Sequence, residues 1–236
     1  MKNKLRAEIS SFNGIWEGGF KTGYDKKRNQ KGIEEYLKKD IKNKCVLEIG
    51  CGGGQWSKFM HKYVNNLFCV DILSEDHNQF WKYVGEEKKD KIKYYQIKDF
   101  SLNEIENDSI DYVFSYDVFC HISMTGQAEY LKNLFLKCKN SAQLFIMYAD
   151  AVKYFDNEPE HICIQEEEQG IYNDNDKLIN KLVQECDGQP YPGRWYWIGI
   201  DNFIYLCEKY GYHIIQRDLN IDKTNPVTLF QKPKLI

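Results

Sequence analysis

Two ionisable side chains that could do acid–base chemistry lie close together near the middle of the chain. Asp117 comes directly after the apolar segment 110–116, and His121 follows four residues later. An imidazole whose pKa lies near neutrality can remove a proton from an acceptor hydroxyl. We therefore expect Asp117 and His121 to be catalytic, with His121 as the general base. A structural role or a contact to a cofactor is the alternative for this histidine.

A cluster of glycines between residues 50 and 54 indicates a second chemical feature. It follows the apolar run 45–49 and precedes an amphipathic segment. A buried strand that turns sharply into a helix has this pattern, with glycines where φ is positive or a ligand approaches closely. A dinucleotide fingerprint starting at Gly50 needs its third glycine at position 55, which is Gln55. The pattern therefore disfavours NAD.

Alternating strands and helices are predicted to position these residues. The predicted strands cover residues 44–49, 67–71, 92–97, 110–116 and 143–148, and the predicted helices cover 33–41, 55–64, 75–87 and 126–138. Such alternation favours a parallel sheet covered by helices on both faces. Ligands bind beyond the carboxyl ends of the strands in these sheets, so we expect the candidate residues to meet at one edge.

The last part of the chain has a different pattern. Asp201 predicts the N-cap of a helix that runs to about residue 210 and stops at Gly211, and extended segments follow at 212–218 and 227–231. Residues 150–200 lack clear periodicity, and we interpret them as an inserted cap over the site. Residues 1–30 are expected to form an N-terminal arm or lid, followed by a single domain over residues 31–236.

The spacing Glu48-x-Gly50-x-Gly52-x-Gly54 resembles the first motif of class I S-adenosylmethionine (SAM) methyltransferases. The predicted tail supports the resemblance, which covers residues 44–150 and 201–232. It implies an α/β, Rossmann-like sandwich with a seven-stranded, mostly parallel sheet whose last strand is antiparallel. It also implies SAM as the cofactor and S-adenosylhomocysteine as its product.

The resemblance assigns cofactor contacts to residues at the ends of strands. Asp71 is expected to accept hydrogen bonds from the ribose hydroxyls, with Ile72 against the adenine, and Asp99 and Phe100 are expected at the adenine amine and ring. A surface acid and a core phenylalanine are the alternatives for the latter pair. The complete set of expected cofactor contacts is Trp16, Glu48, Gly50, Gly52, Gly54, Trp56, Asp71, Ile72, Asp99, Phe100, Ser115 and Tyr116.

The acceptor is expected to bind the aromatic run 191–197 in the insertion. Aromatic faces bind sugar rings or planar molecules, and an arginine binds phosphate or carboxylate groups; the core of a cap or a dimer interface explains the run equally well. A resemblance to small methyltransferases of bacterial surface-glycan clusters implies a sugar or capsule phosphoramidate precursor, with O-methylation favoured over N-methylation. The expected substrate contacts are Tyr24, Arg194, Trp195, Tyr196 and Trp197.

A magnesium-dependent enzyme, an NAD-dependent oxidoreductase and a SAM-binding protein without catalysis stay open as competing hypotheses. Asp117 and Asp150 follow adjacent predicted strands, as in magnesium-dependent catechol methyltransferases. Those enzymes have an Asn where this chain has Ala151, so one of three expected ligands is missing. We therefore expect no metal.

Composition limits the partners and the compartment. A net charge of −3, from 32 Lys and Arg against 35 Asp and Glu, gives no electrostatic case for nucleic acid. The eight cysteines are scattered without a C-x-x-C pair, which is typical of free thiols in a reducing cytoplasm. The sequence shows no apolar run long enough for a membrane span. We expect a cytoplasmic monomer or homodimer that binds a small-molecule acceptor.

Overall fold

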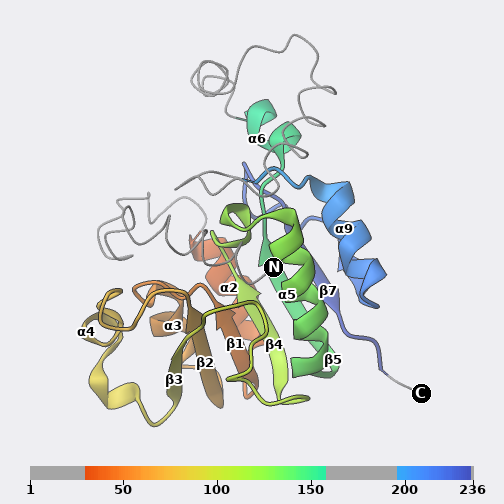
Figure 1. The fold of residues 1–236 in the computed structure, drawn as a ribbon. Helices are drawn as coiled ribbons and strands as arrows, with labels where there is room; N and C mark the ends of the chain where they lie inside the picture. Colours follow the sequence, from red (N-terminus) through yellow and green to blue (C-terminus); the bar gives the residue numbers. More distant parts are fainter. Residues whose placement is uncertain (1–29, 158–195, 235–236) are drawn as a thin grey trace.

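A computed structural model describes residues 30–157 and 196–234 of the protein. Their centre is a seven-stranded sheet with the strand order β3-β2-β1-β4-β5-β7-β6 (Figure 1). The strands are β1 (Cys45–Ile49), β2 (Asn66–Asp71), β3 (Ile92–Gln96), β4 (Ile110–Ser115), β5 (Cys138–Met147), β6 (His213–Gln216) and β7 (Val227–Gln231).

The pairing of the strands confirms the expected mixture of parallel and antiparallel neighbours. β1 pairs in parallel with both β2 and β4, and β7 is antiparallel to both β5 and β6. Glu48 on β1 lies opposite Cys69 on β2 and Phe114 on β4. The order reverses at β1, between β2 and β4, so the carboxyl ends of these strands form the switch point where open α/β sheets bind ligands.

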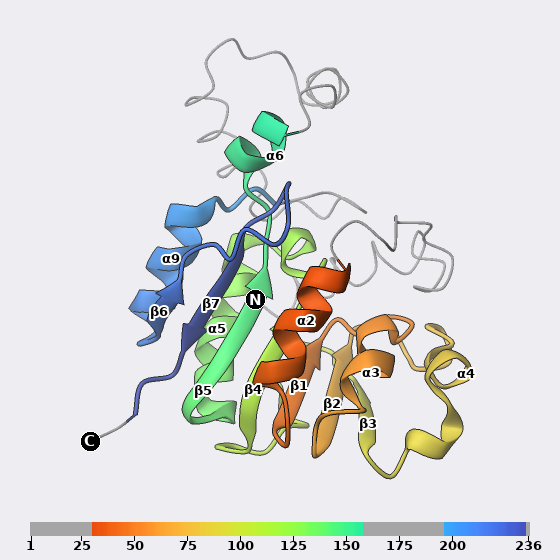
Figure 2. The same cartoon turned by 180° about the vertical axis from the view of Figure 1, so that it is seen from behind.

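Helices cover both faces of the sheet, as Figures 1 and 2 show from opposite sides. One face is covered by α2 (Gln30–Asp40), α3 (Gln55–Met60) and α4 (Phe80–Val84), and the other by α5 (Met124–Lys137) and α9 (Ile200–Lys209). A short helix, α6 (Ala151–Asn157), lies beyond the carboxyl end of β5. Two 3-10 turns, η1 (Glu86–Lys88) and η2 (Phe119–His121), complete the described elements.

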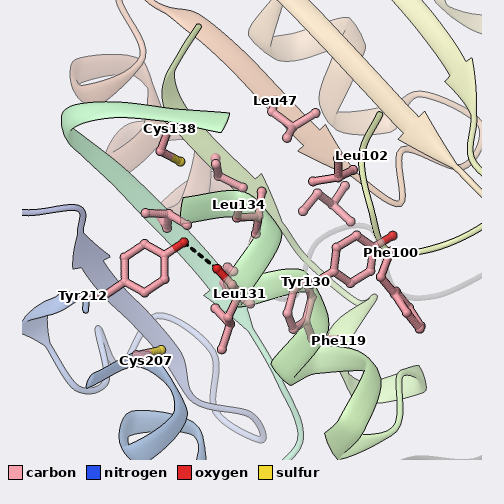
Figure 3. Close-up of a cluster of buried hydrophobic side chains, with 14 of the residues drawn as sticks. Leu47, Phe100, Leu102, Phe119, Tyr130, Leu131, Leu134, Cys138, Cys207 and Tyr212 are labelled. Atoms are coloured by element: carbon pink, nitrogen blue, oxygen red, sulfur yellow. Dashed lines mark hydrogen bonds between the residues drawn. The ribbon is translucent and has the colours of Figure 1, made fainter. Parts of the chain in front are cut away.

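The side chains between α5, α9 and the sheet form the hydrophobic cluster drawn in Figure 3. Tyr148 stacks on Phe203 with 3.9 Å between the ring centroids, which joins β5 to α9. The Tyr212 hydroxyl donates a hydrogen bond of 2.8 Å to the carbonyl oxygen of Leu131 on α5, the dashed line in Figure 3. Because this core holds α5 against β4 and β5, it also holds the η2 turn that precedes α5.

The structure corrects two sequence predictions about helices. The helix expected over residues 75–87 is reduced to α4 and η1, because Gln79 (φ +50°) and Gly85 (φ +111°) both leave the helical region. The N-cap position of α9 is Gly199, and Asp201 lies in the first turn, exposed and ion-paired with Arg217. Gly211 does follow the end of α9 with φ +88°, as predicted.

The described cysteines agree with the sequence interpretation. Six thiols in the described ranges are unpaired, and all of them except the half-buried Cys45 are buried. Cys163 and Cys186 lie outside the described residues. Within those same ranges, no helix is both long enough and apolar enough to cross a membrane.

Candidate active site

The glycine turn between β1 and α3 has two glycines with different functions. Gly50 has φ +71°, and a Cβ built on it would lie 2.2 Å from Cγ2 of Val118, so the segment that leads to η2 packs directly on this turn. Gly52 has φ +49°, and a Cβ there would meet no atom within 4 Å among the described residues beyond its own chain neighbours. The space on the Cβ side of Gly52 is therefore open, as the close approach of a ligand requires.

Asp71 connects the end of β2 to the glycine turn. Its carboxylate accepts hydrogen bonds from the backbone N–H groups of Gly52 (2.8 Å) and Leu73 (2.9 Å). Burial raises the pKa of Asp71, and hydrogen bonds from Leu73, Gly52 and Asn78 act in the opposite direction. The carboxylate for which the sequence predicted the ribose contact thus lies at the glycine turn.

Glu48 is buried beneath the glycine turn. Its Oε2 accepts a hydrogen bond of 2.5 Å from the Ser57 hydroxyl and lies 3.6 Å from the Cys69 thiol. Desolvation raises the pKa of Glu48 to about 8, with hydrogen bonds from Ser57 and Cys69 opposing the shift. Since Ser57 belongs to α3, the Glu48 side chain connects the central strand to the helix that follows the turn.

The ends of β1 and β4 are joined at the same edge of the sheet. The buried Ser115 hydroxyl donates to the carbonyl oxygen of Ile49 at 3.2 Å. The ring of Trp56 on α3 packs edge-on against Tyr116, with 5.7 Å between the centroids. The Tyr116 hydroxyl donates to Asp222, which lies in the connection between β6 and β7. Segments far apart in the sequence therefore contribute to this edge.

Asp117, the next residue, has an uncommon backbone conformation. Its φ is +60°, in the left-handed region that aspartate tolerates better than most residues, and its side chain is exposed. Desolvation by the surrounding protein and the negative charge of Asp222 raise the pKa of Asp117. These effects raise the pKa to about 7, and the residue as a whole is exposed, so a ligand can reach this carboxylate and it can gain or lose a proton near neutral pH.

His121 ends the η2 turn and is half-buried. Its backbone N–H donates to the carbonyl oxygen of Val118 at 2.9 Å, which closes the turn. Val118 is the residue that packs on Gly50. Val118 therefore links the backbone of the η2 turn, which carries the predicted base, to the glycine turn, and Asp117 directly precedes Val118.

The residues expected at the adenine lie further along the same edge. The backbone carbonyl of Ile72 accepts from Gln96, and Asp99 accepts from the backbone N–H of Ser101 at 2.9 Å. The Phe100 ring is buried and lies against Tyr130 (Figure 3), packed edge-on with 4.8 Å between the ring centroids. Phe100 is therefore a core side chain in this structure, and its contact to adenine stays a prediction.

Asp150 has a specific structural role. Its Oδ1 accepts from the backbone N–H of Lys153 in α6, and its Oδ2 accepts from that of Ile200 in α9, both at 2.8 Å. One carboxylate thus caps two helices, which explains its position after β5 without a magnesium ion. Within the described ranges, no group of three or more His, Cys, Asp or Glu side chains is arranged to hold a metal.

The expected substrate contacts are only partly described. Tyr24, Arg194 and Trp195 lie outside the described residues, as does Trp16, an expected cofactor contact. Tyr196 and Trp197 are buried; Trp197 packs 5.4 Å from Tyr154 of α6, and the N–H of Tyr196 donates to the Cys120 carbonyl at 2.7 Å. Trp197 therefore packs in the core beside α6, and Tyr196 connects the start of the second described range to η2.

Two residues at this edge were missed by the sequence prediction. Asp222 lies 106 positions from its partner Tyr116, and no local pattern marks that pairing. Gln127 reads as one more polar residue of an amphipathic helix, although its side chain is fully buried. A glutamine at a position where the helical period requires an apolar side chain was the available signal.

Comparison with known families shows which family the chain belongs to. A family model described as a methyltransferase domain matches residues 22–217, which is most of the chain. The chain belongs to the methyltransferase-domain family. A search of curated proteins gives no significant match.

Solved structures show that the methyltransferase shares its fold with distant relatives. The PH0226 protein from Pyrococcus horikoshii is 16% identical, with a TM-score of 0.62 and 98% and 99% of the two chains covered. A SAM-dependent methyltransferase from Mesorhizobium loti is 10% identical, with a TM-score of 0.58 and coverages of 85% and 96%. The N-methyltransferase NodS from Bradyrhizobium japonicum is 11% identical, with a TM-score of 0.56 and coverages of 91% and 99%. The fold is therefore that of the SAM-dependent methyltransferases.

Proposed function

We propose that this methyltransferase binds SAM at the glycine turn and transfers its methyl group to a hydroxyl of a small molecule. The observation that supports the proposal is the packing of Val118, the residue directly before η2, on Gly50 of the glycine turn. SAM supplies a methyl group already activated on a sulfonium. The protein therefore needs to position the acceptor, exclude water and remove a proton.

The residues present fit such a cofactor. Gly52 leaves its Cβ side open, and the Asp71 carboxylate, which accepts the Gly52 N–H, is proposed to bind the ribose hydroxyls. Glu48 keeps the turn and α3 together, Ile72, Asp99 and Phe100 are proposed at the adenine, and Trp56, Ser115 and Tyr116 are proposed near the methionine end. Trp16 is proposed as a further contact from the arm.

We propose His121 as the general base and a sugar or phosphoramidate precursor of a surface glycan as the acceptor. Tyr24 and the aromatic run at 194–197, with Arg194 for a phosphate or carboxylate, are the proposed acceptor contacts. The free, mostly buried thiols of the described residues support a reducing compartment such as the cytoplasm.

Methylation of an amine is the second candidate. The exposed carboxylate of Asp117, with Asp222 near it, suits a cationic amine better than a neutral hydroxyl. NodS, one of the proteins of the same fold, is named as an N-methyltransferase. An amine that arrives protonated also needs a base before it can attack, so His121 or Asp117 would serve this reaction as well.

Turnover of labelled SAM with a panel of sugars, amino sugars and phosphorylated metabolites tests the two candidates. With a hydroxyl acceptor, His121→Ala should lower kcat by about 10²–10⁴-fold and leave SAM affinity nearly unchanged. His213→Ala, an exposed histidine on β6, is the matched control and should retain full turnover.

Three different results would change the proposal. Transfer to amines alone would replace the first candidate by the second. A parallel loss of SAM affinity in His121→Ala would make His121 a cofactor contact. No transfer to any acceptor, with SAM bound normally, would favour a binding protein without catalysis.

A further inference from the structure

The η2 turn that carries His121 is held by a side chain from the next helix. Nε2 of Gln127, in the first turn of α5, donates to the carbonyl oxygens of Phe119 and Ile122, each at 2.8 Å. These two carbonyls lie on either side of His121 in the sequence. A single amide group therefore fixes both ends of the segment from which the imidazole projects.

A second contact holds the middle of the same turn. The carbonyl oxygen of Cys120 accepts the backbone N–H of Tyr196 at 2.7 Å. Three backbone carbonyls around His121 are thus joined to neighbouring elements, and the Gln127 side chain makes two of those three hydrogen bonds. Of these three carbonyls, removing Gln127 would leave that of Cys120 with its hydrogen bond to a neighbouring element of the described residues.

Packing alone does not explain a glutamine at this position. The Gln127 side chain is fully buried, and its Oε1 has no hydrogen-bond partner among the residues that the structure describes. A buried acceptor without a partner costs free energy; an apolar side chain of similar length would avoid that cost but would leave the Phe119 and Ile122 carbonyls without this donor. The two bonds to the η2 turn are what the amide adds.

We propose that Gln127 is a positioning residue that sets the orientation of His121 for proton removal. The proposal rests on the function proposed above, in which His121 is the base. A general base must keep hydrogen-bond reach to the acceptor, and a displacement of about 1 Å can lower turnover by about 10²-fold. Gln127 contributes by making the turn rigid, without contacting the cofactor or the acceptor.

The variant Gln127→Met tests this, because methionine has nearly the same length and no N–H donor. The matched control is Tyr212→Phe, which removes a buried hydrogen bond to the Leu131 carbonyl on the same helix and leaves both Gln127 hydrogen bonds in place (Figure 3). NMR of ring-labelled histidines needs no acceptor. The His121 ring signals should shift and broaden in Gln127→Met and match the wild type in Tyr212→Phe. Unchanged His121 signals in Gln127→Met would overturn the proposal.

Turnover with the acceptor found in the panel gives the second readout. Gln127→Met should lower kcat by about 10–100-fold and change the SAM dissociation constant by less than about twofold. Combined with His121→Ala, it should cause no further loss, because it acts through His121. An equal loss in the presence and absence of His121 would overturn the positioning role. Full turnover of His121→Ala alone would instead disprove the base assignment, so the two failures are distinguishable.

Discussion

Acidic residues at the carboxyl edge of the sheet differ in role because their neighbours differ. Asp117 faces solvent, Asp71 accepts two backbone N–H bonds, and Glu48 is sealed beneath the glycine turn. The same carboxyl chemistry therefore yields an open charge, a strand-to-loop connection and a buried acid whose pKa is raised to about 8.

Replacing Glu48 with Gln should change how stability depends on pH. Because burial raises the pKa of Glu48 to about 8, the folded protein keeps a proton that the unfolded chain releases above its ordinary pKa. Stability from this group is complete at low pH and is lost as the pH rises toward 8. Between low pH and pH 8 or above, the free energy of unfolding should therefore fall by about 2–4 kcal/mol less in Glu48→Gln than in the wild type, since one pKa unit is about 1.4 kcal/mol.

Urea unfolding at about pH 5 and about pH 8.5 measures this difference. Glutamine keeps an oxygen that can accept from Ser57, so the variant should still fold. Unfolding free energies that fall equally with pH in wild type and Glu48→Gln would show that Glu48 ionises as easily in the folded protein as in the unfolded chain.

At the scale of elements, the two helices α6 and α9 share one cap. Asp150 accepts an N–H from each, and α9 has only Gly199 at its own N-cap position, without a side-chain hydrogen bond. Helices need such acceptors because their first N–H groups have no intrahelical partner. A residue 50 positions away in sequence therefore takes the role that local pattern assigned to Asp201.

Two alanine substitutions separate these caps. Asp150→Ala removes both acceptors and should lower the free energy of unfolding by about 1–3 kcal/mol. Asp201→Ala removes an exposed ion pair with Arg217 and should change it by less than about 0.5 kcal/mol. Chemical denaturation measures both, and an Asp201→Ala variant that loses more than Asp150→Ala would reverse the assignment.

At the scale of the whole molecule, cofactor binding should stabilise the fold. S-adenosylhomocysteine at 100 times its dissociation constant should raise the melting temperature by about 5–10 °C, and NAD should not. Asp71→Ala should lose most of this shift, because a hydrogen bond to a charged group contributes about 1.5–3 kcal/mol, or about 10–100-fold in affinity.

Asp111→Asn is the control for that measurement. Its carboxylate also accepts a backbone N–H, that of Cys45 at 2.9 Å, but at the amino end of β1 and far from the glycine turn. It should keep the full shift with S-adenosylhomocysteine. A shift with NAD alone would remove the SAM assignment altogether.

The sequence by itself determined most of the strands and helices along the chain and the glycine turn, and its resemblance to class I methyltransferases implied the antiparallel last strand. Periodicity and positive φ at glycine are local properties, so the turn at Gly50 and the helix end at Gly211 can be predicted without a structure. The sequence also placed Asp71 at the end of one strand and His121 a few residues after another, and parallel strands bring their carboxyl ends to one edge.

Only the tertiary structure decided which side chains meet at that edge. The cap from Asp150 to α9, the contact of Asp222 with Tyr116 and the return of Tyr196 to η2 join segments that lie 50 or more positions apart. The two bonds of Gln127 are close in sequence, yet they require η2 to fold back onto α5. Such contacts depend on packing between elements, which no local pattern in a single sequence specifies.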